Sequence, residues 1–455
     1  MKNNKFPVRG WSAFGRKPIS ISLSPNVQKD DVHLALKTLL KVWHWKKGRE
    51  IIDLEEQFKK YLGVKYAYSF NSGRSALFAI LIALRTSSEP QSNSLPKGKR
   101  VLLQAFTCNA VPNPILWADL NPVYIDCGSD FNIDIEDLKR KIKPHDVVIV
   151  QHTFGLPANM QEIMQIAEEN DAIVIEDCAH ALGAQYKDFS EINEVGLPTE
   201  ALAKVGTIGK AGFFSFSRDK VISCVYVGMA VTNDDQIGKK LQELQKQFGY
   251  PTRYWICQQL CHPIALQYVI LPLYNFFDLG KIFLVLSQWF YILSKAVSWK
   301  EKRGLQPNYF PKALPSALAK LALHQFKKID IFNIHRKKIT DFYFQELANT
   351  KFGLPSQGGI FLRFSVQHPK AHEIIYEAWH AENILLGDWY TTPIAPADTN
   401  MEDMRYTHGM CPKAERLAKV TLNLPTHINI SLQPRSGQAI SDAQRIVQFL
   451  KKYSS

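Results

Sequence analysis

The sequence contains no Cys-x-x-Cys pair and no cluster of cysteine and histidine with the spacing of a zinc site. Its seven cysteines are odd in number and scattered along the chain, which argues against a framework of disulfides. The N-terminal stretch MKNNKFPVRGWSAFGRK lacks the apolar run of a secretory signal peptide. These absences argue against a disulfide-rich secreted scaffold and against a structural zinc protein, and we expect a reduced, cytoplasmic chain.

Acidic residues are also in short supply. The chain of 455 residues has 42 Asp and Glu against 55 Lys and Arg, which gives a formal net charge of +13. The segment 236–340 alone holds 16 basic and 4 acidic residues, so the rest of the chain is nearly balanced. Such an excess favours an anionic partner, for example nucleic acid, a membrane surface or a phosphorylated substrate. Because no nucleic-acid-binding module is recognisable, we expect no nucleic acid partner.

Internal repeats and low-complexity tracts are absent as well. Apolar residues make up 46% of the chain and charged residues 21%, both near the averages of globular proteins. These values argue against a disordered, fibrous or polytopic membrane protein. With the length, they predict one large and one smaller globular domain.

What the chain does contain is an alternation of apolar strands and amphipathic helices. We expect helices at 50–62, 76–84 and 160–169, and short strands at 66–70, 101–104, 122–125, 147–151 and 172–175. Because the strands are apolar throughout and helices separate them, they predict an α/β fold with a parallel sheet covered on both faces. Ligands of such folds bind at the carboxyl ends of the strands.

Three features along this alternation predict a chemical site. The turn Ser72-Gly73 opens a helix, whose N–H groups can hold an anion. The pair Glu176-Asp177 ends a strand, and Lys220 follows an aromatic run. Each is ordinary by itself, as a helix cap, a strand end or a surface lysine. Together they suit pyridoxal phosphate (PLP), which needs an anion cradle, a carboxylate for its pyridine nitrogen and a lysine for its aldehyde.

These motifs occur in the order of one enzyme family. They comprise Ser72 to Leu77, Phe106-Thr107, Pro122 to Asp126, His152 to Pro157, Glu176 to Ala184, Val205 to Gly209, Phe214 to Lys220 and Leu424-Pro425. On these residues, from about Gly48 to about Ile430, the chain resembles the DegT-type (DegT/DnrJ/StrS) sugar aminotransferases. The resemblance implies a PLP-dependent enzyme of fold type I.

The resemblance also implies the roles of the site residues. Lys220 would bond to the cofactor aldehyde and carry the proton between substrate and cofactor, and Asp177 would pair with the pyridine nitrogen. The other cofactor contacts would come from His180 at the ring hydroxyl, Cys108 on the ring face, Gly73, Arg74, Ser75 and Ser215 at the phosphate, and Asn308 of the neighbouring subunit. The last assignment implies a homodimer with shared active sites. No metal site is expected.

Three positions depart from the family pattern. The threonine of the phosphate turn is Arg74 here, and Cys108 stands where an aromatic residue stacks on the cofactor ring. The segment 227–232 has lost one glycine. Lys220 is intact, which argues against the dehydratase branch of the family, where histidine replaces this lysine.

The domain organisation follows from the same resemblance. We expect an N-terminal extension at 1–45, a large cofactor-binding domain at 46–316 and a smaller C-terminal α/β domain at 317–455. The large domain would contain a mainly parallel seven-stranded sheet. The stretch 359–366 would form one strand of the smaller domain.

One insertion, 254–299, leaves the family pattern. It is apolar and aromatic, and Asp278 to Lys281 is expected to form a turn between two apolar arms. Each arm is shorter than the ~20 residues of a transmembrane helix. Cations flank the segment, which predicts an interfacial membrane anchor with tryptophan and tyrosine at headgroup depth. The alternative is a hairpin buried against the dimer partner or over the active site.

The function implied by the resemblance is transfer of an amino group, by family habit from glutamate, to a keto-sugar in nucleotide- or lipid-linked form. Such sugars serve cell-surface polysaccharides or secondary metabolites. Trp389 and Tyr390 are candidate walls of the acceptor site. The alternatives are a PLP-dependent dehydratase or lyase of the same family, and a membrane-associated regulatory protein with a degenerate PLP site.

Overall fold

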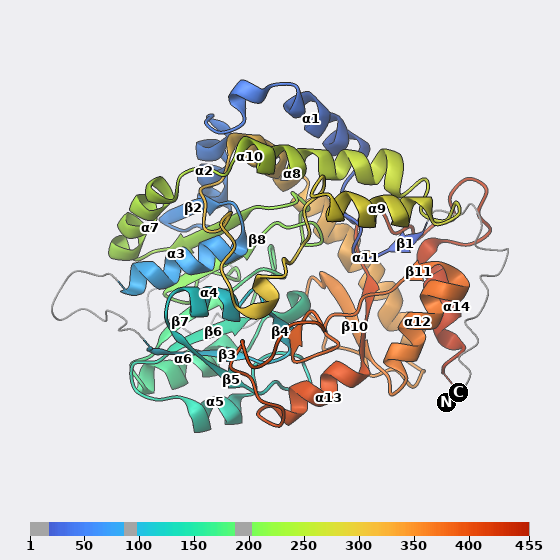
Figure 1. Cartoon of the computed structure of the whole chain (residues 1–455). Helices are drawn as coiled ribbons and strands as arrows, with labels where there is room; N and C mark the ends of the chain where they lie inside the picture. The colour runs from blue at the N-terminus through green and yellow to red at the C-terminus, as the bar shows by residue number, and fades with distance from the viewer. Residues whose placement is uncertain (1–17, 86–97, 187–202, 455) are drawn as a thin grey trace.

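The computed structural model describes residues 18–85, 98–186 and 203–454 (Figure 1). Residues 1–17 of the predicted N-terminal extension lie outside these ranges.

A seven-stranded sheet forms the centre of the N-terminal two-thirds of the chain. Its strands lie in the order β2-β9-β8-β7-β6-β3-β5. All neighbours are parallel except β9, which runs antiparallel to both β2 and β8. The strands are β2 (Tyr66–Phe70), β3 (Arg100–Gln104), β5 (Asn121–Ile125), β6 (Val147–Gln151), β7 (Ile173–Asp177), β8 (Ala211–Ser215) and β9 (Gly228–Thr232). The predicted α/β class and the mainly parallel seven-stranded sheet are confirmed.

Both faces of this sheet are buried, which explains why its strands are apolar throughout. In β6, Val148 and Val150 belong to one core, whereas Val147 and Ile149 belong to another on the opposite face. The first core is closed by helices α2 (Glu50–Leu62), α6 (Met160–Glu169) and α10 (Ser316–Phe326). The second is closed by α3 (Gly73–Arg85), α4 (Pro112–Trp117), α7 (Asp235–Phe248) and α13 (Pro412–Val420).

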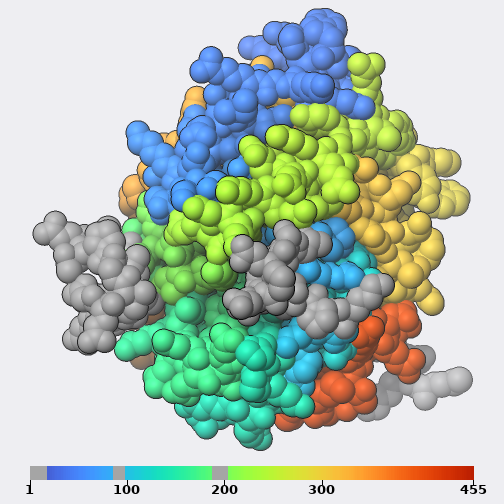
Figure 2. Space-filling model, turned by 90° about the vertical axis from the view of Figure 1, so that its left-hand side faces the viewer, coloured from blue at the N-terminus to red at the C-terminus, as the bar shows by residue number. Residues whose placement is uncertain are grey.

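The remaining elements surround these layers. The helices are α1 (Lys29–Leu39), α5 (Ile135–Lys141), α8 (Arg253–Ala265), α9 (Leu279–Trp289), α11 (Ile329–Leu347), α12 (Ala371–Glu382) and α14 (Asp442–Lys451). Short helical turns lie at Val42–His44, Thr153–Gly155, Leu266–Ile270 and Glu301–Arg303. The short strands are β1 (Ile19–Ser20), β4 (Thr107–Cys108), β11 (Ile384–Leu385) and β12 (Ile394–Ala395). In the space-filling view, the blue N-terminal residues and the yellow-green residues around α7 and α8 form one continuous surface (Figure 2).

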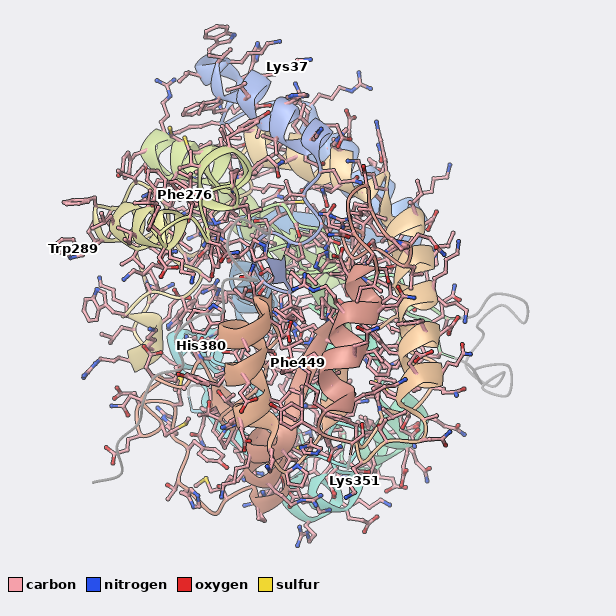
Figure 3. The ribbon with its side chains drawn as sticks, turned by 90° about the vertical axis from the view of Figure 1, so that its right-hand side faces the viewer. Lys37, Phe276, Trp289, Lys351, His380 and Phe449 are labelled. Carbon is pink, nitrogen blue, oxygen red and sulfur yellow. The ribbon has the colours of Figure 1, made fainter. Side chains whose placement is uncertain are left out.

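A third core lies in the C-terminal part of the chain. Its two strands, β10 (Arg363–Gln367) and β13 (Thr421–Pro425), pair antiparallel. Helices α11, α12 and α14 contribute to this core, and α12 packs against α14 (Figure 3). The predicted division at 316/317 stays a prediction. Helix α10, which spans this position, packs against α2 in the first core.

Three predicted segments depart most from the structure. The helix predicted at 76–84 begins earlier, at Gly73, because the Ser72 carbonyl already accepts the Ala76 N–H at 3.0 Å. The strand predicted at 359–366 begins only at Arg363, because the preceding residues cross the 153–155 turn, where the Ile360 N–H donates to the Gly155 carbonyl. A turn was predicted at 278–281. In the structure the turn ends at Asp278, and α9 already begins at Leu279.

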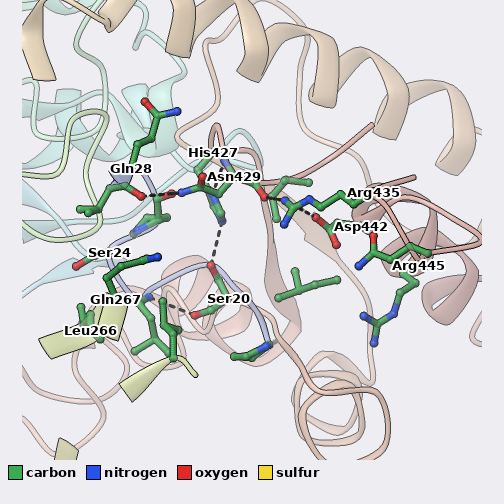
Figure 4. Close-up of a pocket in the computed structure, with 18 of the residues that line it drawn as sticks. Ser20, Ser24, Gln28, Leu266, Gln267, His427, Asn429, Arg435, Asp442 and Arg445 are labelled. Carbon is green, nitrogen blue, oxygen red and sulfur yellow. Dashed lines mark hydrogen bonds and ion pairs between the residues drawn. The ribbon is translucent and has the colours of Figure 1, made fainter. Parts of the chain in front are cut away.

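The strand β1 fastens the N-terminal segment to the C-terminal part. It pairs parallel with β11, and His427 Nε2 donates to the Ser20 carbonyl at 3.0 Å beside a cavity of 1100 Å³ (Figure 4). Burial lowers the pKa of His427 from 6.5 to about 3, although the bond to Ser20 opposes this shift. The imidazole is therefore neutral in the folded protein.

Because His427 is buried in its neutral form, we expect the free energy of unfolding to fall in mild acid. The depressed pKa means that its contribution is present above pH 6.5 and is lost as the pH falls toward 3. At pH 5.5 the loss is about 1.4 kcal/mol. We expect His427→Gln, whose amide does not titrate, to show a correspondingly flatter pH dependence in urea unfolding between pH 7 and 5. Equal slopes in the two proteins would contradict this account.

Candidate active site

A cavity of 310 Å³ lies at the carboxyl ends of the parallel strands, within the ~300–1,000 Å³ range of small-molecule and cofactor sites. Seven of the nine predicted site residues line it: Gly73, Arg74, Cys108, Asp177, His180, Ser215 and Lys220. They come from separate parts of the sequence and meet because neighbouring strands end together. In β6 and β7, for example, Gln151 lies opposite Asp177.

Lys220 extends from the loop that follows β8. Burial lowers the pKa of its amine, while the nearby Asp219 carboxylate opposes the shift. Its Nζ lies 4.6 Å from the centre of the Trp389 ring. The Lys220 carbonyl accepts a hydrogen bond of 2.8 Å from the side chain of Asn26, and Arg336 donates to both Asn26 and the Val221 carbonyl. These buried contacts fix the position of the lysine.

Asp177 is the last residue of β7. One of its oxygens accepts the Ala179 N–H at 3.0 Å. Burial raises the pKa of Asp177 to about 6, even though that hydrogen bond and the charge of Lys220 favour the carboxylate. A cation beside a buried carboxylate stabilises its charged form, and a protonated pyridine nitrogen would be such a cation.

The neighbouring Glu176 is oriented for a structural task. Its side chain is fully buried and accepts hydrogen bonds from the N–H groups of Gly206, Ile208 and Gly209. The Tyr186 hydroxyl donates to it at 2.8 Å, and His152 Nε2 lies 3.2 Å away. Burial opposes its ionisation, but the hydrogen bonds from His152 and the loop outweigh burial and lower the pKa of Glu176. Glu176 thus ties the loop before β8 to the end of β7.

This arrangement predicts a large stability effect at position 176. In Glu176→Gln, an amide NH₂ replaces one acceptor oxygen, so buried donors lose their partner, at a cost of about 3 kcal/mol. The control Tyr186→Phe removes one donor only and should cost about 1 kcal/mol. Urea unfolding measures both values. If the two variants lost the same stability, the role assigned to the Glu176 carboxylate would be wrong.

The N-terminus of α3 forms the anion end of the cavity. Its first N–H groups have no carbonyl partner within the helix and carry the positive end of the helix dipole. A side chain at Gly73 would place its Cβ 2.8 Å from the Cβ of Ser215, and a Cβ at Gly228 would lie 2.1 Å from the Ser72 carbonyl. The two glycines therefore allow the turn, the start of β9 and the Ser215 hydroxyl to approach closely enough to form a cradle.

Arg74 closes this end of the cavity in a way that a threonine would not. Its guanidinium forms a buried ion pair with Glu301 and donates to the Ala296 carbonyl at 3.1 Å. It also lies 4.8 Å from the centre of the Phe310 ring. These contacts fix the 296–301 segment, and Ala296 and Val297 form part of the cavity wall.

His180 is a neutral hydrogen-bonding group. Burial, followed by the charges of Lys220 and Arg363, lowers its pKa well below the ordinary value. Its Nδ1 accepts the Phe154 N–H at 3.2 Å, so we assign the proton to Nε2, which lies 3.5 Å from the Tyr390 hydroxyl. The imidazole is stacked on the Trp389 ring, with centres 5.3 Å apart. An N–H donor is therefore available at this position.

Two predicted site residues lie elsewhere. Ser75 is fully buried behind the cradle, and its hydroxyl donates to Asn71 at 2.7 Å, whereas the Ser72 side of the turn faces the cavity. Asn308 is exposed and borders a separate surface hollow beside Phe78 and Phe248. Their contacts with a phosphate stay predictions.

Sequence reasoning assigned no role to Arg363 and Asp219. Arg363, on β10, forms an ion pair of 3.1 Å with Asp219 and places its guanidinium 3.3 Å from the centre of the Trp389 ring. Arg363 and Lys220 thus both lie against the Trp389 ring. The available signal was an arginine inside the apolar run Phe361 to Phe364, because a buried arginine needs an acidic partner.

Comparison with known sequences identifies the family. The profile of the DegT/DnrJ/EryC1/StrS aminotransferase family matches residues 26–258 and 311–437. The chain belongs to this family. The unmatched stretch, 259–310, contains most of the predicted insertion and also Asn308. The predicted family and its enzyme class are confirmed.

Relatives in this family include nucleotide-sugar enzymes. A GDP-perosamine synthase of Caulobacter vibrioides is 29% identical over 235 residues, or 51% of this chain and 57% of that protein. A UDP-N-acetyl-3-dehydro-alpha-D-glucosamine 3-aminotransferase of Acidithiobacillus ferrooxidans is 26% identical over 379 residues, or 82% of each. The match to the first protein thus spans only a little over half of its length.

Solved structures agree on the fold. Helicobacter pylori PseC, an aminotransferase involved in the biosynthesis of pseudaminic acid, superposes with a TM-score of 0.68 at 20% identity. The superposition covers 96% of this chain and 99% of PseC. The predicted fold type I architecture is confirmed.

Proposed function

We propose that this protein is a PLP-dependent aminotransferase that transfers an amino group from glutamate to a keto-sugar carried by a nucleotide or a lipid. The observation that carries the proposal is the meeting of Lys220, Asp177 and the N-terminus of α3 in one buried cavity. Family membership and the nucleotide-sugar enzymes among the relatives support it. The pathway would be the synthesis of cell-surface polysaccharides or secondary metabolites.

The residues of the cavity fit PLP. The cradle of Gly73 and Ser215 at the start of α3 would hold the phosphate, and the raised pKa of Asp177 suits a partner that brings a positive charge. The His180 Nε2–H would donate to the ring hydroxyl, and Cys108 lines the wall on which the ring would pack. When bound, PLP would supply an electron sink for the bond changes at the amino-bearing carbon.

Lys220 would move the proton in each half of the transfer. Burial lowers the pKa of its amine and so makes the neutral, proton-accepting form more accessible at physiological pH. The fixed backbone contacts of its loop limit the volume that Nζ explores, which places it for repeated proton transfer. Asp219, held by Arg363, keeps a negative charge near the amine.

The acceptor sugar would bind at the aromatic side of the cavity. Trp389, Tyr390 and Thr391 line this side. Arg363, which lies 3.3 Å from the centre of the Trp389 ring, would hold this side chain in place in the wall. The position of Trp389 next to Lys220 would bring the sugar carbonyl near the reacting amine.

A homodimer with shared active sites is part of this proposal. Asn308 is exposed and is not among the residues that line its own cavity, which suits a residue that serves a neighbouring subunit. We place the reaction in the cytoplasm.

The test is a screen of nucleotide- and lipid-linked keto-sugars with glutamate as the amino donor and formation of 2-oxoglutarate as the readout. We expect 2-oxoglutarate to form in multiple turnovers only when a matching keto-sugar is present. A PLP-loaded protein that eliminates water from the sugars, without forming 2-oxoglutarate, would overturn the proposal.

A further inference from the structure

The helical segment 253–303 carries a surface that the rest of the fold does not explain. Helix α8 is anchored, because Trp255, Ile256 and Leu260 are buried in the first core and α8 packs against α1 and α10. The chain then reverses direction, and α9 lies on the outside of the molecule (Figure 1). Most of this segment lies outside the residues matched by the family.

Helix α9 has its polar and apolar sides reversed relative to a helix of a water-soluble fold. Its buried residues are the small Gly280 and Ser287. A Cβ at Gly280 would lie 2.2 Å from the Ile270 carbonyl, so this glycine allows α9 to press against the preceding turn. The reversal directs the large apolar side chains of α9 away from the protein.

We call the resulting surface the α9 face, formed by Leu279, Ile282, Phe283, Val285, Leu286 and Trp289. Val285 is 64% exposed and Trp289 69% exposed, and Trp289 projects from the edge of the molecule (Figure 3). Phe290, Tyr291 and Ile292 continue the face, each more than half exposed. Contiguous apolar surface of this kind marks an interaction site, because single exposed apolar residues are normal but clusters are not.

The segment that carries the α9 face has an excess of positive charge. Within 253–303 there are six basic residues and two acidic ones. Both acids are neutralised, Asp278 by Lys281 at 3.0 Å and Glu301 by Arg74. Arg253, Lys295 and Arg303 remain exposed. An apolar face with a cationic border complements a layer of anionic headgroups above hydrocarbon.

The dimensions restrict how such a face can meet a membrane. Helix α9 has 11 residues, which corresponds to a length of about 16 Å, and the hydrocarbon layer is about 30 Å thick. Among the described residues, no helix is long and apolar enough to cross a membrane. The face can therefore lie in the interface, where tryptophan and tyrosine are favoured.

We infer that the α9 face docks on the surface of an anionic phospholipid bilayer. A second copy of the chain fits less well, because a two-fold contact through this face would bring the cationic borders of both copies together. The inference does not depend on the proposed reaction. Docking would nevertheless affect the proposed reaction, because Ala296 and Val297, just beyond the α9 face, line the catalytic cavity.

The same placement links the face to the cofactor cradle. The inner side of α9 contributes Leu284 and Gln288 to a cavity of 190 Å³ that Arg74, Arg218 and Asp219 also line. Docking would therefore bring the catalytic cavity close to the headgroups. A sugar acceptor attached to a lipid would reach the site from that side.

The test is co-sedimentation of the full chain with vesicles, without substrate. We expect binding to vesicles that contain phosphatidylglycerol, weaker binding to pure phosphatidylcholine, and weakening as salt is raised. Val285→Ser/Trp289→Ser should weaken binding at least about tenfold. Its control, Trp43→Ser/Ile52→Ser, changes side chains that are 72% and 61% exposed on another surface and should bind as the wild type does.

A second pair of variants tests the charge. Lys295→Glu/Arg303→Glu should weaken binding to anionic vesicles at least about tenfold. Lys37→Glu/Lys351→Glu changes the net charge equally at distant exposed positions and should weaken binding much less. Circular dichroism verifies that all variants fold.

Two results would overturn the inference. One is a wild-type chain that does not bind anionic vesicles at low salt. If Val285→Ser/Trp289→Ser also converted dimers to monomers, the α9 face would be a subunit interface. The other is equal vesicle binding by each variant and its control. Because no substrate is used, either result leaves the proposed reaction untouched.

Discussion

Replacing Lys220 by alanine is expected to lower the rate of amino transfer by at least ~10³-fold, the loss typical of removing a positioned proton-transfer group. The amine is buried beside Trp389, and burial lowers its pKa, so no water-exposed lysine can substitute for it. The visible absorption of PLP bonded to a lysine should disappear in the same variant. Steady-state rates and absorption spectra measure the two effects.

Two controls separate this chemistry from folding. Lys220→Arg keeps the positive charge near Trp389 but provides no nucleophilic amine, and it should be as inactive as Lys220→Ala. Lys37→Ala removes an exposed lysine and should leave the rate unchanged. A Lys220→Ala protein that turns over at even a tenth of the normal rate would refute the role of this lysine.

Asp177→Asn is expected to lower turnover by about 10²- to 10³-fold, because a neutral amide cannot stabilise a protonated pyridine nitrogen. The pKa of Asp177 is raised to about 6 by burial. The carboxylate therefore forms as the pH rises through that value, and PLP affinity should increase over the same range. Titration of PLP binding against pH, in the wild type and in Asp177→Asn, measures this dependence.

Asp126 provides the matched control. It also follows a strand and is buried, but its oxygens accept the N–H groups of Lys413 and Ala414 outside the cavity. Asp126→Asn should reduce stability and leave turnover nearly unchanged. If it reduced turnover as much as Asp177→Asn, the effect would come from general destabilisation.

Much of the central sheet could be predicted because its strands carry a strong local signal. Runs such as Val147 to Gln151 are apolar and β-branched, so both their type and their bounds were recovered. The strand Ala211–Ser215 was not predicted, because it begins with Ala-Gly, two residues that are uncommon in strands. Its place beside β7 depends on contacts between distant parts of the chain, which periodicity does not report.

The candidate site divides in the same way. Lys220, Asp177 and Gly73 lie in linear motifs, and the structure brings them to one cavity as the motifs predict. The contact of Arg363 with Asp219 joins residues 144 positions apart, so no local pattern could show it. The structure also gives contacts for the two departures at Arg74 and Cys108. Arg74 pairs with Glu301, which lies in the segment 259–310 that the family profile does not match. Cys108 lines the cavity wall.

The orientation of α9 could not be predicted for another reason. Seven of the eleven residues of LGKIFLVLSQW are large and apolar, and the small and polar residues gather on one side, which in a water-soluble fold would face solvent. The sequence predicted an apolar segment flanked by cations. The structure adds that small residues, Gly280 and Ser287, determine which side is buried.

The most direct test of the central claim is the first half of the reaction, with PLP-loaded protein and L-glutamate and no sugar acceptor. We predict loss of the visible absorption of the lysine-bound cofactor and formation of one 2-oxoglutarate per active site, neither of which occurs in Lys220→Ala. The opposite result is a wild-type chain that shows the visible absorption of lysine-bound PLP, yet forms no keto acid from glutamate or from any other amino donor. That result would contradict the assignment as an aminotransferase.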